Sequence, residues 1–225
     1  RRTKVLSFSD VSNVSGTATP AAELCQMAHE QDIAVHIDGA QTFGVKKINL
    51  HKINCDTYAG SAHKWFMGPK EAGLFYIRKD RVPDAWPTVV GSGWGNEIAP
   101  EPVGARKFET LGQRNDATLA AIAKACELHN TLEEASIEMR TRELATALKE
   151  GIDKIPGAKL YTSLNPDLSL GVVVFNLGER VDHKKAYARL YDEHGVGGAY
   201  FPGPEPKLRL CPHIYNTMAE VERVI

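Results

Sequence analysis

Apolar and polar positions alternate along the first eighty residues in a way that predicts an α/β fold. Short apolar runs bounded by polar or turn residues are typical of buried strands, and longer runs with helical periodicity lie between them. Pro20 suits the first turn of the first helix. The expected strands are 4–9, 33–38, 57–62 and 72–79, and the expected helices are 20–31 and 48–56. Strands that alternate with helices imply a mostly parallel sheet flanked by helices on both faces.

The middle of the chain changes character twice. Residues 80–115 are rich in glycine and proline and lack clear periodicity, which is long for a loop without structure and therefore suggests a functional segment. From Asp116 to about Ile155 the pattern is helical, with a break expected near Asn130.

After the turn signal "IPGAK" the pattern indicates strand, strand, helix, strand, helix, which is a smaller C-terminal α+β unit. Asp182 is expected to cap the helix of this unit and Gly195 to end it, and residues 217–220 have the spacing of a capping box. We therefore predict two domains, residues 1–155 and residues 156–225.

Neither the charge nor the hydropathy of the chain suggests a nucleic-acid or membrane partner. The 27 Lys and Arg residues balance 28 Asp and Glu residues, and no charge run suggests a nucleic-acid groove or a membrane-binding face. No apolar run approaches the roughly 20 residues of a membrane span. A small molecule or another protein chain is the expected partner.

Cysteine and histidine usage gives no sign of a metal site. Cys25, Cys55, Cys126 and Cys211 form no CxxC pair, which suits reduced thiols in a cytoplasmic protein rather than a disulfide framework. The eight histidines form no HExxH motif and no close cluster. We expect no metal.

Three polar features follow predicted strands. In an open parallel sheet, ligands bind outside the carboxyl ends of the strands, because the loops there vary while the sheet holds them. Asp38 ends the second strand and precedes two small residues that would let a bulky group approach the backbone. The other features are Asn13 with Gly16 after the first strand, and Ser61, His63 and Lys64 after the third.

This set of residues suits carbanion formation next to an amino group. A lysine can form a Schiff base with an aldehyde cofactor, and a carboxylate beside a pyridine nitrogen keeps that nitrogen protonated, so that the ring withdraws electrons from the substrate. Lys64 and Asp38 fit these two roles. Gln41 could donate to the ring's phenolic oxygen, and Ser61 and His63 could hold a phosphate. Asp38 and Lys64 could instead form a structural ion pair, but the order strand, Asp, crossover, strand, Ser-x-His-Lys argues against it.

The segment "DGAQTFG…CDTYAGSAHKWFMGPKEAGLFYIRK" resembles the core of the class V aminotransferases, fold-type I pyridoxal-phosphate enzymes that include cysteine desulfurases, selenocysteine lyases and isopenicillin N epimerase. The motifs Asp-Gly-Ala-Gln, Ser-x-His-Lys and Gly-Pro-x-x-x-Gly occur in the family's order. "SNVSGTATP", "FETLGQRN" and "LRLCPHIYNTMAEVERV" extend the resemblance over nearly the whole chain.

The resemblance implies a fold, a cofactor and residue roles. It implies a fold-type I large domain with a smaller C-terminal α+β domain, pyridoxal phosphate as cofactor, an amino-acid substrate and a homodimer. In this resemblance Lys64 carries the cofactor, Asp38 pairs with the pyridine nitrogen, Ser61 and His63 contact the phosphate, Gln41 and Asn13 lie by the phenolic oxygen, and Arg209 takes the substrate carboxylate.

Two departures from the family bear on function. Gly112-Gln113 stands where the family has Gly-Thr, a threonine that reaches the neighbouring subunit's phosphate, and the Gln113 amide could substitute. No cysteine precedes Arg209 where desulfurases carry their reactive one, and Cys211 is badly placed for that role. We therefore expect epimerisation or C–S cleavage, with transamination or desulfuration as alternatives.

Arg209, His63 and Asn13 could also have purely structural roles. Arg209 could be a solvent-facing residue of an edge strand, His63 could cap a turn, and Asn13 could serve only its own loop. "GSGWGNE" at 91–97 lacks the Lys-Ser/Thr ending of a phosphate loop, and "NVSGTATP" lacks the GxGxxG of a dinucleotide binder.

The resemblance also predicts a missing part. Relatives carry a long segment before the lysine, with a small-residue loop under the phosphate and an aromatic residue or histidine on the ring. Lys64 lies too near the start of this sequence for either, so we expect a segment upstream. A non-catalytic truncated fragment that keeps the fold for dimerisation is the remaining alternative.

Overall fold

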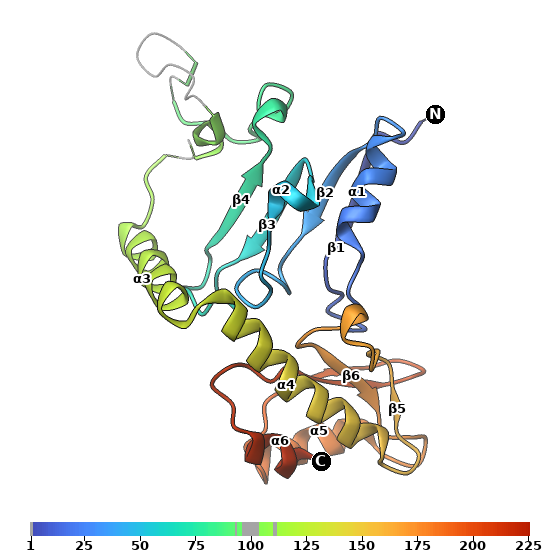
Figure 1. Cartoon of the computed structure of the whole chain (residues 1–225). Helices are drawn as coiled ribbons and strands as arrows, with labels where there is room; N and C mark the ends of the chain where they lie inside the picture. Colours follow the sequence, from blue (N-terminus) through green and yellow to red (C-terminus); the bar gives the residue numbers. More distant parts are fainter. Residues whose placement is uncertain (1, 93, 96–103, 110–111) are drawn as a thin grey trace.

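The computed structural model describes residues 2–92, 94–95, 104–109 and 112–225. It contains two sheets, which lie in separate units joined by the long helix α4, Glu134–Asp153 (Figure 1). The predicted α/β class is confirmed. Parts of the predicted loop 80–115 and of the segment 91–97 lie outside the described residues. The described parts of that loop include two 3₁₀ helices, η1 (Lys79–Arg81) at its start and η2 (Gly104–Phe108).

The first sheet is mostly parallel, as predicted. Its strands follow the order β1-β2-β3-β4, and β1, β2 and β3 run parallel while β4 runs antiparallel to β3. Helices α1 and α2 make the crossovers. The bounds are β1 Val5–Ser9, α1 Ala21–His29, β2 Ala34–Asp38, α2 Leu50–Ile53, β3 Thr57–Ser61 and β4 Gly73–Ile77.

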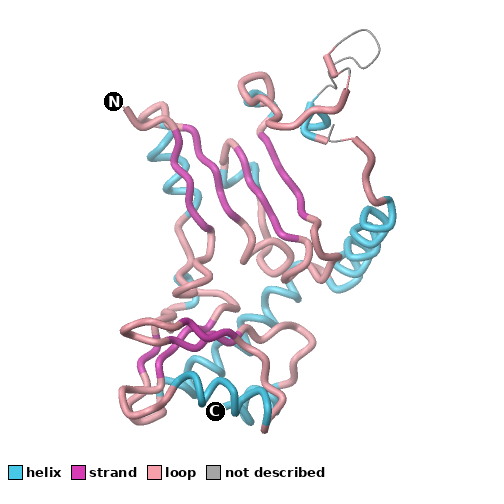
Figure 2. The backbone as a smooth tube through the Cα atoms, turned by 180° about the vertical axis from the view of Figure 1, so that it is seen from behind, coloured by secondary structure: helices cyan, strands magenta, loops and turns pink. Residues whose placement is uncertain are grey.

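The two faces of this sheet differ. α1 and α2 lie on one face, where alternate strand residues form a core with Ala21, Cys25 and Ala28 of α1. On the other face Val5 is 58% exposed and Phe75 is 45% exposed. Seen from behind in Figure 2, no helix crosses these strands. Within the described residues, the prediction of helices on both faces therefore holds for one face. The strand residues of this core are the buried Val35, Ile37 and Tyr58 and the partly buried Leu6, Phe8, Leu74 and Tyr76.

Two helices lead from the first sheet to the second. α3, Asp116–Leu132, begins at Asn115, whose side chain accepts a hydrogen bond from Ala117 N at 3.0 Å. The helical stretch breaks at Glu133, where φ is +63°, three residues after the predicted position. The buried side of α4 packs on the second sheet, so the predicted division at residue 155 leaves this helix with the first domain although its core contacts are with the second. The α4 residues in that core are Leu144, Ala145, Leu148 and Ile152.

The second unit is an antiparallel sheet with two helices. Its strands follow the order β5-β6-β8-β7. One strand was predicted after the helix, whereas the structure has two, because the turn "PGPE" with Gly203 at φ +150° reverses the chain between them. The bounds are β5 Lys159–Leu160, η3 Pro166–Leu168, β6 Val173–Asn176, α5 His183–Asp192, β7 Ala199–Phe201, β8 Lys207–Leu210 and α6 Met218–Val224.

The predicted helix signals of this unit are confirmed. Asp182 accepts a hydrogen bond from Lys185 N at 3.0 Å, Gly195 follows α5 with φ +66°, and Thr217 forms a capping box with Glu220. No helix in the described ranges is both long and apolar enough to cross a membrane.

The loop after β1 joins the two units. Thr162 Oγ1 donates to Ser15 O at 2.8 Å, and Ala18 N donates to Leu168 O at 2.9 Å. Gly16 has φ +71°, and a Cβ there would lie 2.3 Å from the carbonyl oxygen of Val172. The contact therefore requires glycine, both for its conformation and for the close approach.

Candidate active site

The carboxyl ends of β1, β2 and β3 point toward the second unit (Figure 1). Ser9 pairs with Asp38, and Asp38 pairs with Ala59, two residues before Ser61. Paired residues of neighbouring strands share a face, and so do residues two apart on one strand. Ser9, Asp38 and Ser61 therefore project from the same face at the same edge of the sheet.

Asp38 is held in place without a counter-charge. Its carboxylate accepts hydrogen bonds from Ala40 N at 2.9 Å and from Ser9 Oγ at 3.4 Å, and the residue is exposed. No described cation lies within ion-pair distance of it, Lys64 included. The alternative that Asp38 and Lys64 only form a structural ion pair is therefore wrong for this structure.

Lys64 lies in a tight turn that follows β3. Gly68 N donates to Ala62 O at 2.7 Å, Met67 N donates to Lys64 O at 3.0 Å, and Met67 has φ +57°. His63 and Lys64 are exposed, and Ser61 is half-buried. The side chains of these three residues make no hydrogen bond with any residue that the structure describes. A hydroxyl, an imidazole and an amine are thus available to a ligand at one end of the strand.

Two buried aromatic residues anchor this turn. Trp65 is 4% exposed and Phe66 is 7% exposed, so the backbone is fixed while Lys64 faces solvent. Trp65 O lies 3.1 Å from His213 Nε2, and Phe66 O lies 3.1 Å from His129 Nε2. Each histidine ring also stacks on the aromatic ring of the residue that it contacts. Neither histidine was predicted from the sequence. His129 belongs to no motif, His213 has no predicted role within "LRLCPHIYNTMAEVERV", and the two are 84 positions apart.

Gln41 lies in the turn after β2 and is half-buried. Its Oε1 accepts a hydrogen bond from the indole Nε1 of Trp65 at 2.9 Å. The structure therefore links the predicted ring-oxygen partner directly to the residue after Lys64.

A second link at this edge was also missed. Asp10 is fully buried, and its two carboxylate oxygens accept hydrogen bonds from Lys46 Nζ at 2.9 and 3.2 Å. Asp10 N donates to Asp38 O at 3.0 Å. The pair ties the end of β1 to the turn that carries Gln41. Only the fold reveals it, because the two residues are 36 positions apart.

Arg209 and Asn13 come together from opposite ends of the chain. Arg209 Nη1 donates to the carbonyl oxygen of Asn13 at 3.0 Å, and its guanidinium lies 5.3 Å from the centre of the Phe201 ring. β8 lies between β6 and β7, so the alternative that Arg209 belongs to an edge strand is wrong. The Asn13 side chain is exposed, and its predicted role stays a prediction.

Gln113 lies in the exposed chain just before the N-cap of α3. Its amide makes no hydrogen bond with a described residue. The predicted contact of Gln113 with a neighbouring subunit stays a prediction.

The available groups match the cofactor that the motifs imply. An unpaired amine suits an aldehyde, a carboxylate without a counter-charge suits a protonated pyridine nitrogen, and free hydroxyl and imidazole groups suit a phosphate. Lys64, Asp38, Ser61 and His63 provide these groups at one sheet edge, and Gln41 lies beside them.

Curated proteins similar to this chain include isopenicillin N epimerases and cysteine desulfurases. The chain is 30% identical over 234 residues to isopenicillin N epimerase of Streptomyces clavuligerus, covering 99% of this chain and 59% of that protein. It is 30% identical over 245 residues to a cysteine desulfurase of Enterobacter sp. (strain 638), covering 100% of this chain and 57% of that protein. The chain thus spans somewhat more than half the length of these curated relatives.

Solved structures agree with the fold. The apo structure of the cysteine desulfurase from Thermococcus onnurineus NA1 matches with a TM-score of 0.88 at 25% identity, covering 98% of this chain and 57% of that chain. The cystine C-S lyase C-DES, solved with cysteine persulfide, matches with a TM-score of 0.85 at 23% identity, covering 99% of this chain and 60% of that chain. The second likeness shows the fold alone.

The family match covers almost every residue. A sequence model of the family described as Aminotransferase class-V matches residues 1–224. The match confirms the resemblance drawn from the motifs, and membership of this family indicates pyridoxal phosphate as the cofactor. With its two-sheet fold and the polar groups at the edge of the first sheet, this chain belongs to the class V aminotransferase family.

Proposed function

We propose that this chain carries the cofactor-binding lysine of a pyridoxal-phosphate enzyme that acts at the α-carbon of an amino acid, with epimerisation or C–S cleavage as the outcome. One observation carries the proposal. The Lys64 amine is exposed and without a partner among the described residues, at the sheet edge that also presents Asp38 without a counter-charge.

Each residue of the proposed site contacts a different part of the cofactor. Lys64 holds it covalently through the amine, Asp38 keeps a proton on the pyridine nitrogen, and Ser61 and His63 bind the phosphate. Gln41 and Asn13 lie by the phenolic oxygen, and Gln113 contacts the phosphate of a neighbouring subunit. When bound, pyridoxal phosphate accepts the electron pair that is left when a bond to the α-carbon breaks.

Arg209 is the proposed site for the substrate carboxylate. A guanidinium has five N–H donors in a planar fork, so it can keep its bond to Asn13 O and still bind a carboxylate through two other donors. A fixed carboxylate determines which bond of the α-carbon is aligned for cleavage. Lys64, once its amine is released by the substrate, is then the base that takes the α-proton.

The absence of a cysteine before Arg209 supports epimerisation or C–S cleavage over desulfuration by a protein thiol. Residues 196–208 contain none, and Cys211 follows Arg209 as an exposed residue. Relatives named as epimerase and as cysteine desulfurase match at equal identity, so desulfuration stays as an alternative. Transamination stays as an alternative because of the family description, Aminotransferase class-V. A homodimer with an amino-acid substrate is part of the proposal.

Borohydride reduction of the full-length protein, followed by peptide mapping, tests the assignment. We expect the reduced cofactor on the peptide that contains Lys64, and no labelled peptide in Lys64→Ala. Lys70→Ala removes another exposed lysine six residues away and should label like the wild type. Label on a different lysine would contradict the site, and the absence of any label would favour a non-catalytic fragment.

Solvent deuterium exchange at the α-carbon separates the reactions. We would follow it across a panel of amino acids and S-substituted cysteines. Exchange with inversion and no keto acid indicates an epimerase, whereas keto acid with sulfur release indicates a lyase. A cofactor-loaded protein that exchanges none of these substrates would contradict the proposal.

A further inference from the structure

Trp65, the residue after Lys64, contacts both the cofactor side of the sheet edge and the second unit. Its indole Nε1 donates to Gln41 Oε1, and its carbonyl oxygen accepts from His213 Nε2. The ring lies in a buried cluster that contains residues of both units. The other members of that cluster are Val11, Val45, Leu170, Val172 and Val174.

The hydrogen bond from Trp65 decides which way the Gln41 amide faces. An indole N–H can only donate, so the atom that it meets must be the carbonyl oxygen of the amide rather than the NH₂ group. The NH₂ group, which carries two donors, makes no hydrogen bond with any described residue. A group that only donates suits an oxygen that carries negative charge.

We propose that Trp65 is a positioning residue that holds the Gln41 NH₂ toward the ring oxygen of the cofactor, and that His213 holds Trp65 in place from the second unit. The inference rests on the proposed function, since the oxygen belongs to pyridoxal phosphate. Without the indole donor, the amide is free to turn and to present its own oxygen, which repels the ring oxygen.

The structure defines the state of His213. Its Nδ1 accepts a hydrogen bond from Ile214 N at 2.8 Å, so the ring proton must lie on Nε2, which donates to Trp65 O. Burial lowers the pKa of His213, which favours this neutral form. The His213 ring stacks with the Trp65 ring, with ring centres 5.3 Å apart, and with the Tyr215 ring, with ring centres 4.5 Å apart. His213 therefore acts on Trp65 through both its ring face and its proton.

The second unit also limits how far the indole can move. A Cβ at Gly171 would lie 2.5 Å from Trp65 Cη2. The absence of a side chain at this position makes room for the six-membered ring of the indole, which lies against Gly171. The indole N–H is therefore aimed at Gln41 by contacts from the other unit, which couples the C-terminal residues to the cofactor side.

Trp65→Phe removes the N–H and keeps most of the ring. The readout is the pH at which the visible absorption of the Lys64-bound cofactor changes, in full-length protein and without substrate. We expect this pKa to rise by about one unit, because a ring oxygen that loses a donor holds the neighbouring proton more tightly. Trp86→Phe, at a residue that is 73% exposed, is the matched control and should leave it unchanged.

A double variant shows whether Trp65 acts through Gln41. Gln41→Met has a similar volume and no N–H, so it should raise the same pKa, and adding Trp65→Phe should then raise it no further. The inference would be overturned if Gln41→Met raised the pKa of the Lys64-bound cofactor and Trp65→Phe did not. It would also be overturned if Trp65→Phe raised this pKa equally in the wild type and in Gln41→Met. If Trp65→Phe does not fold, an unchanged pKa in Gln41→Met overturns it.

The outcomes also separate this inference from the proposed function. A wild-type protein without a borohydride-sensitive visible band refutes the proposed function, and the inference with it. A wild-type protein that has the band, with a pKa insensitive to both single variants, refutes the inference alone.

Discussion

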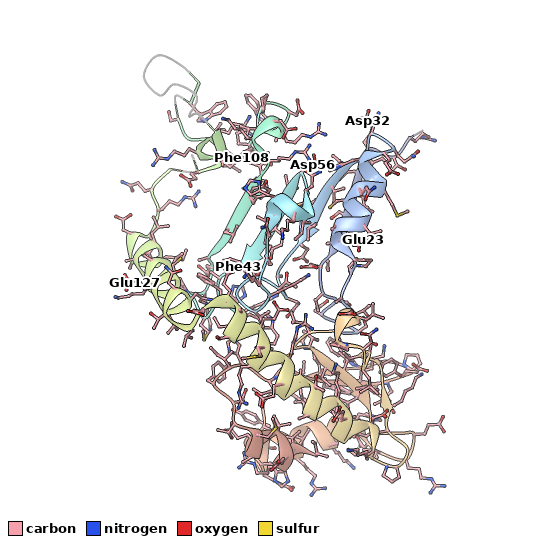
Figure 3. All side chains as sticks on the ribbon, in the orientation of Figure 1. Glu23, Asp32, Phe43, Asp56, Phe108 and Glu127 are labelled. Atoms are coloured by element: carbon pink, nitrogen blue, oxygen red, sulfur yellow. The ribbon has the colours of Figure 1, made fainter. Side chains whose placement is uncertain are left out.

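Asp38 and Asp56 lie at opposite ends of neighbouring strands in the same sheet, and they differ in how fully they are bound. Asp56, whose side chain is 5% exposed, contacts four donors at the amino end of β3. Asp38, at the carboxyl end of β2, is exposed and accepts two hydrogen bonds from uncharged groups. Figure 3 shows Asp56 at the end of the sheet away from the second unit, and Phe43, in the turn after Asp38, at the other end. The Asp56 donors are His29 Nε2, Val35 N, Arg78 Nη2 and Arg81 Nε, at 2.9, 2.6, 3.0 and 2.7 Å.

The difference separates a structural carboxylate from one that is available to a ligand. Burial raises the pKa of Asp56, but the hydrogen bonds from His29, Val35 N and Arg81 and the charge of Arg78 outweigh it, so the pKa lies below its ordinary value. Its four donors leave no room for a ligand. Asp38 is exposed at the sheet edge where Lys64 also lies, and neither side chain has a charged partner among the described residues, so both are accessible to a ligand.

Asp56→Asn should have the largest effect of the variants that test this comparison. It should lower the free energy of unfolding and leave the turnover of the folded protein unchanged. Removing one partner from a buried charge cluster costs about 3–5 kcal/mol in unfolding free energy. Urea titration would measure it, with Asp32→Asn at an exposed residue of the same sheet end as the control. Unchanged stability, or turnover lost in folded protein, would contradict the structural role.

The same variant should change the response to acid. A carboxylate whose pKa is lowered by folding stabilises the protein above its unfolded pKa, near 3.8, and that contribution is lost as pH falls through the lower folded pKa. The wild type should therefore lose stability below about pH 4, and Asp56→Asn should lose less over the same range. If the free energy of unfolding fell with pH equally in the wild type and in Asp56→Asn, the stabilising role of the Asp56 carboxylate would be contradicted.

Asp38→Asn should do the reverse and damage turnover while it preserves stability. An amide can touch the pyridine nitrogen but cannot hold a proton there, so we expect turnover to fall by roughly 10²-fold or more. Unfolding free energy should change by less than about 0.5 kcal/mol, as for other exposed substitutions. Cofactor content, read by absorbance, should stay within about twofold of wild type. An Asp38→Asn enzyme with wild-type turnover would refute the role.

Arg209→Lys should have a smaller effect, confined to substrates with a carboxylate. A lysine keeps the charge and loses the fork, so KM should rise by about tenfold or more, while turnover at saturation changes less. Arg209 is half-buried, and Arg223→Lys at an exposed residue of α6 provides the control. Equal losses for amino acids and for their amides would show that Arg209 does not bind the carboxylate.

The smallest expected effect is that of Cys211→Ser. Turnover of sulfur-containing substrates should stay within about twofold of wild type, as for Cys126→Ser, because the proposed reaction uses no protein thiol. Sulfur transfer that depends on Cys211 would instead establish the desulfurase alternative.

Much of the fold could be predicted from local patterns. The first four strands, their crossovers and the caps at Asp182 and Thr217 follow from apolar runs and turn chemistry, which act over a few residues. The extra strand was missed because β7 has three residues, too few for a periodicity to show. The packing of α4 on the second sheet was missed because an amphipathic pattern indicates a buried face but not the surface that buries it.

The sequence by itself determined the chemistry of the candidate site, since residue types at strand ends and their order along the chain are local properties that a motif records. Lys64, Asp38, Gln41 and Ser61 were predicted in this way. Only the tertiary structure decided which groups are already engaged, because hydrogen bonds and ion pairs depend on positions far apart in the chain. It paired Asp56 with His29 and two arginines and tied Asp10 to Lys46. It gave Asp38 and Lys64 no charged partner among the described residues, and it placed His213 on Trp65 across 148 positions.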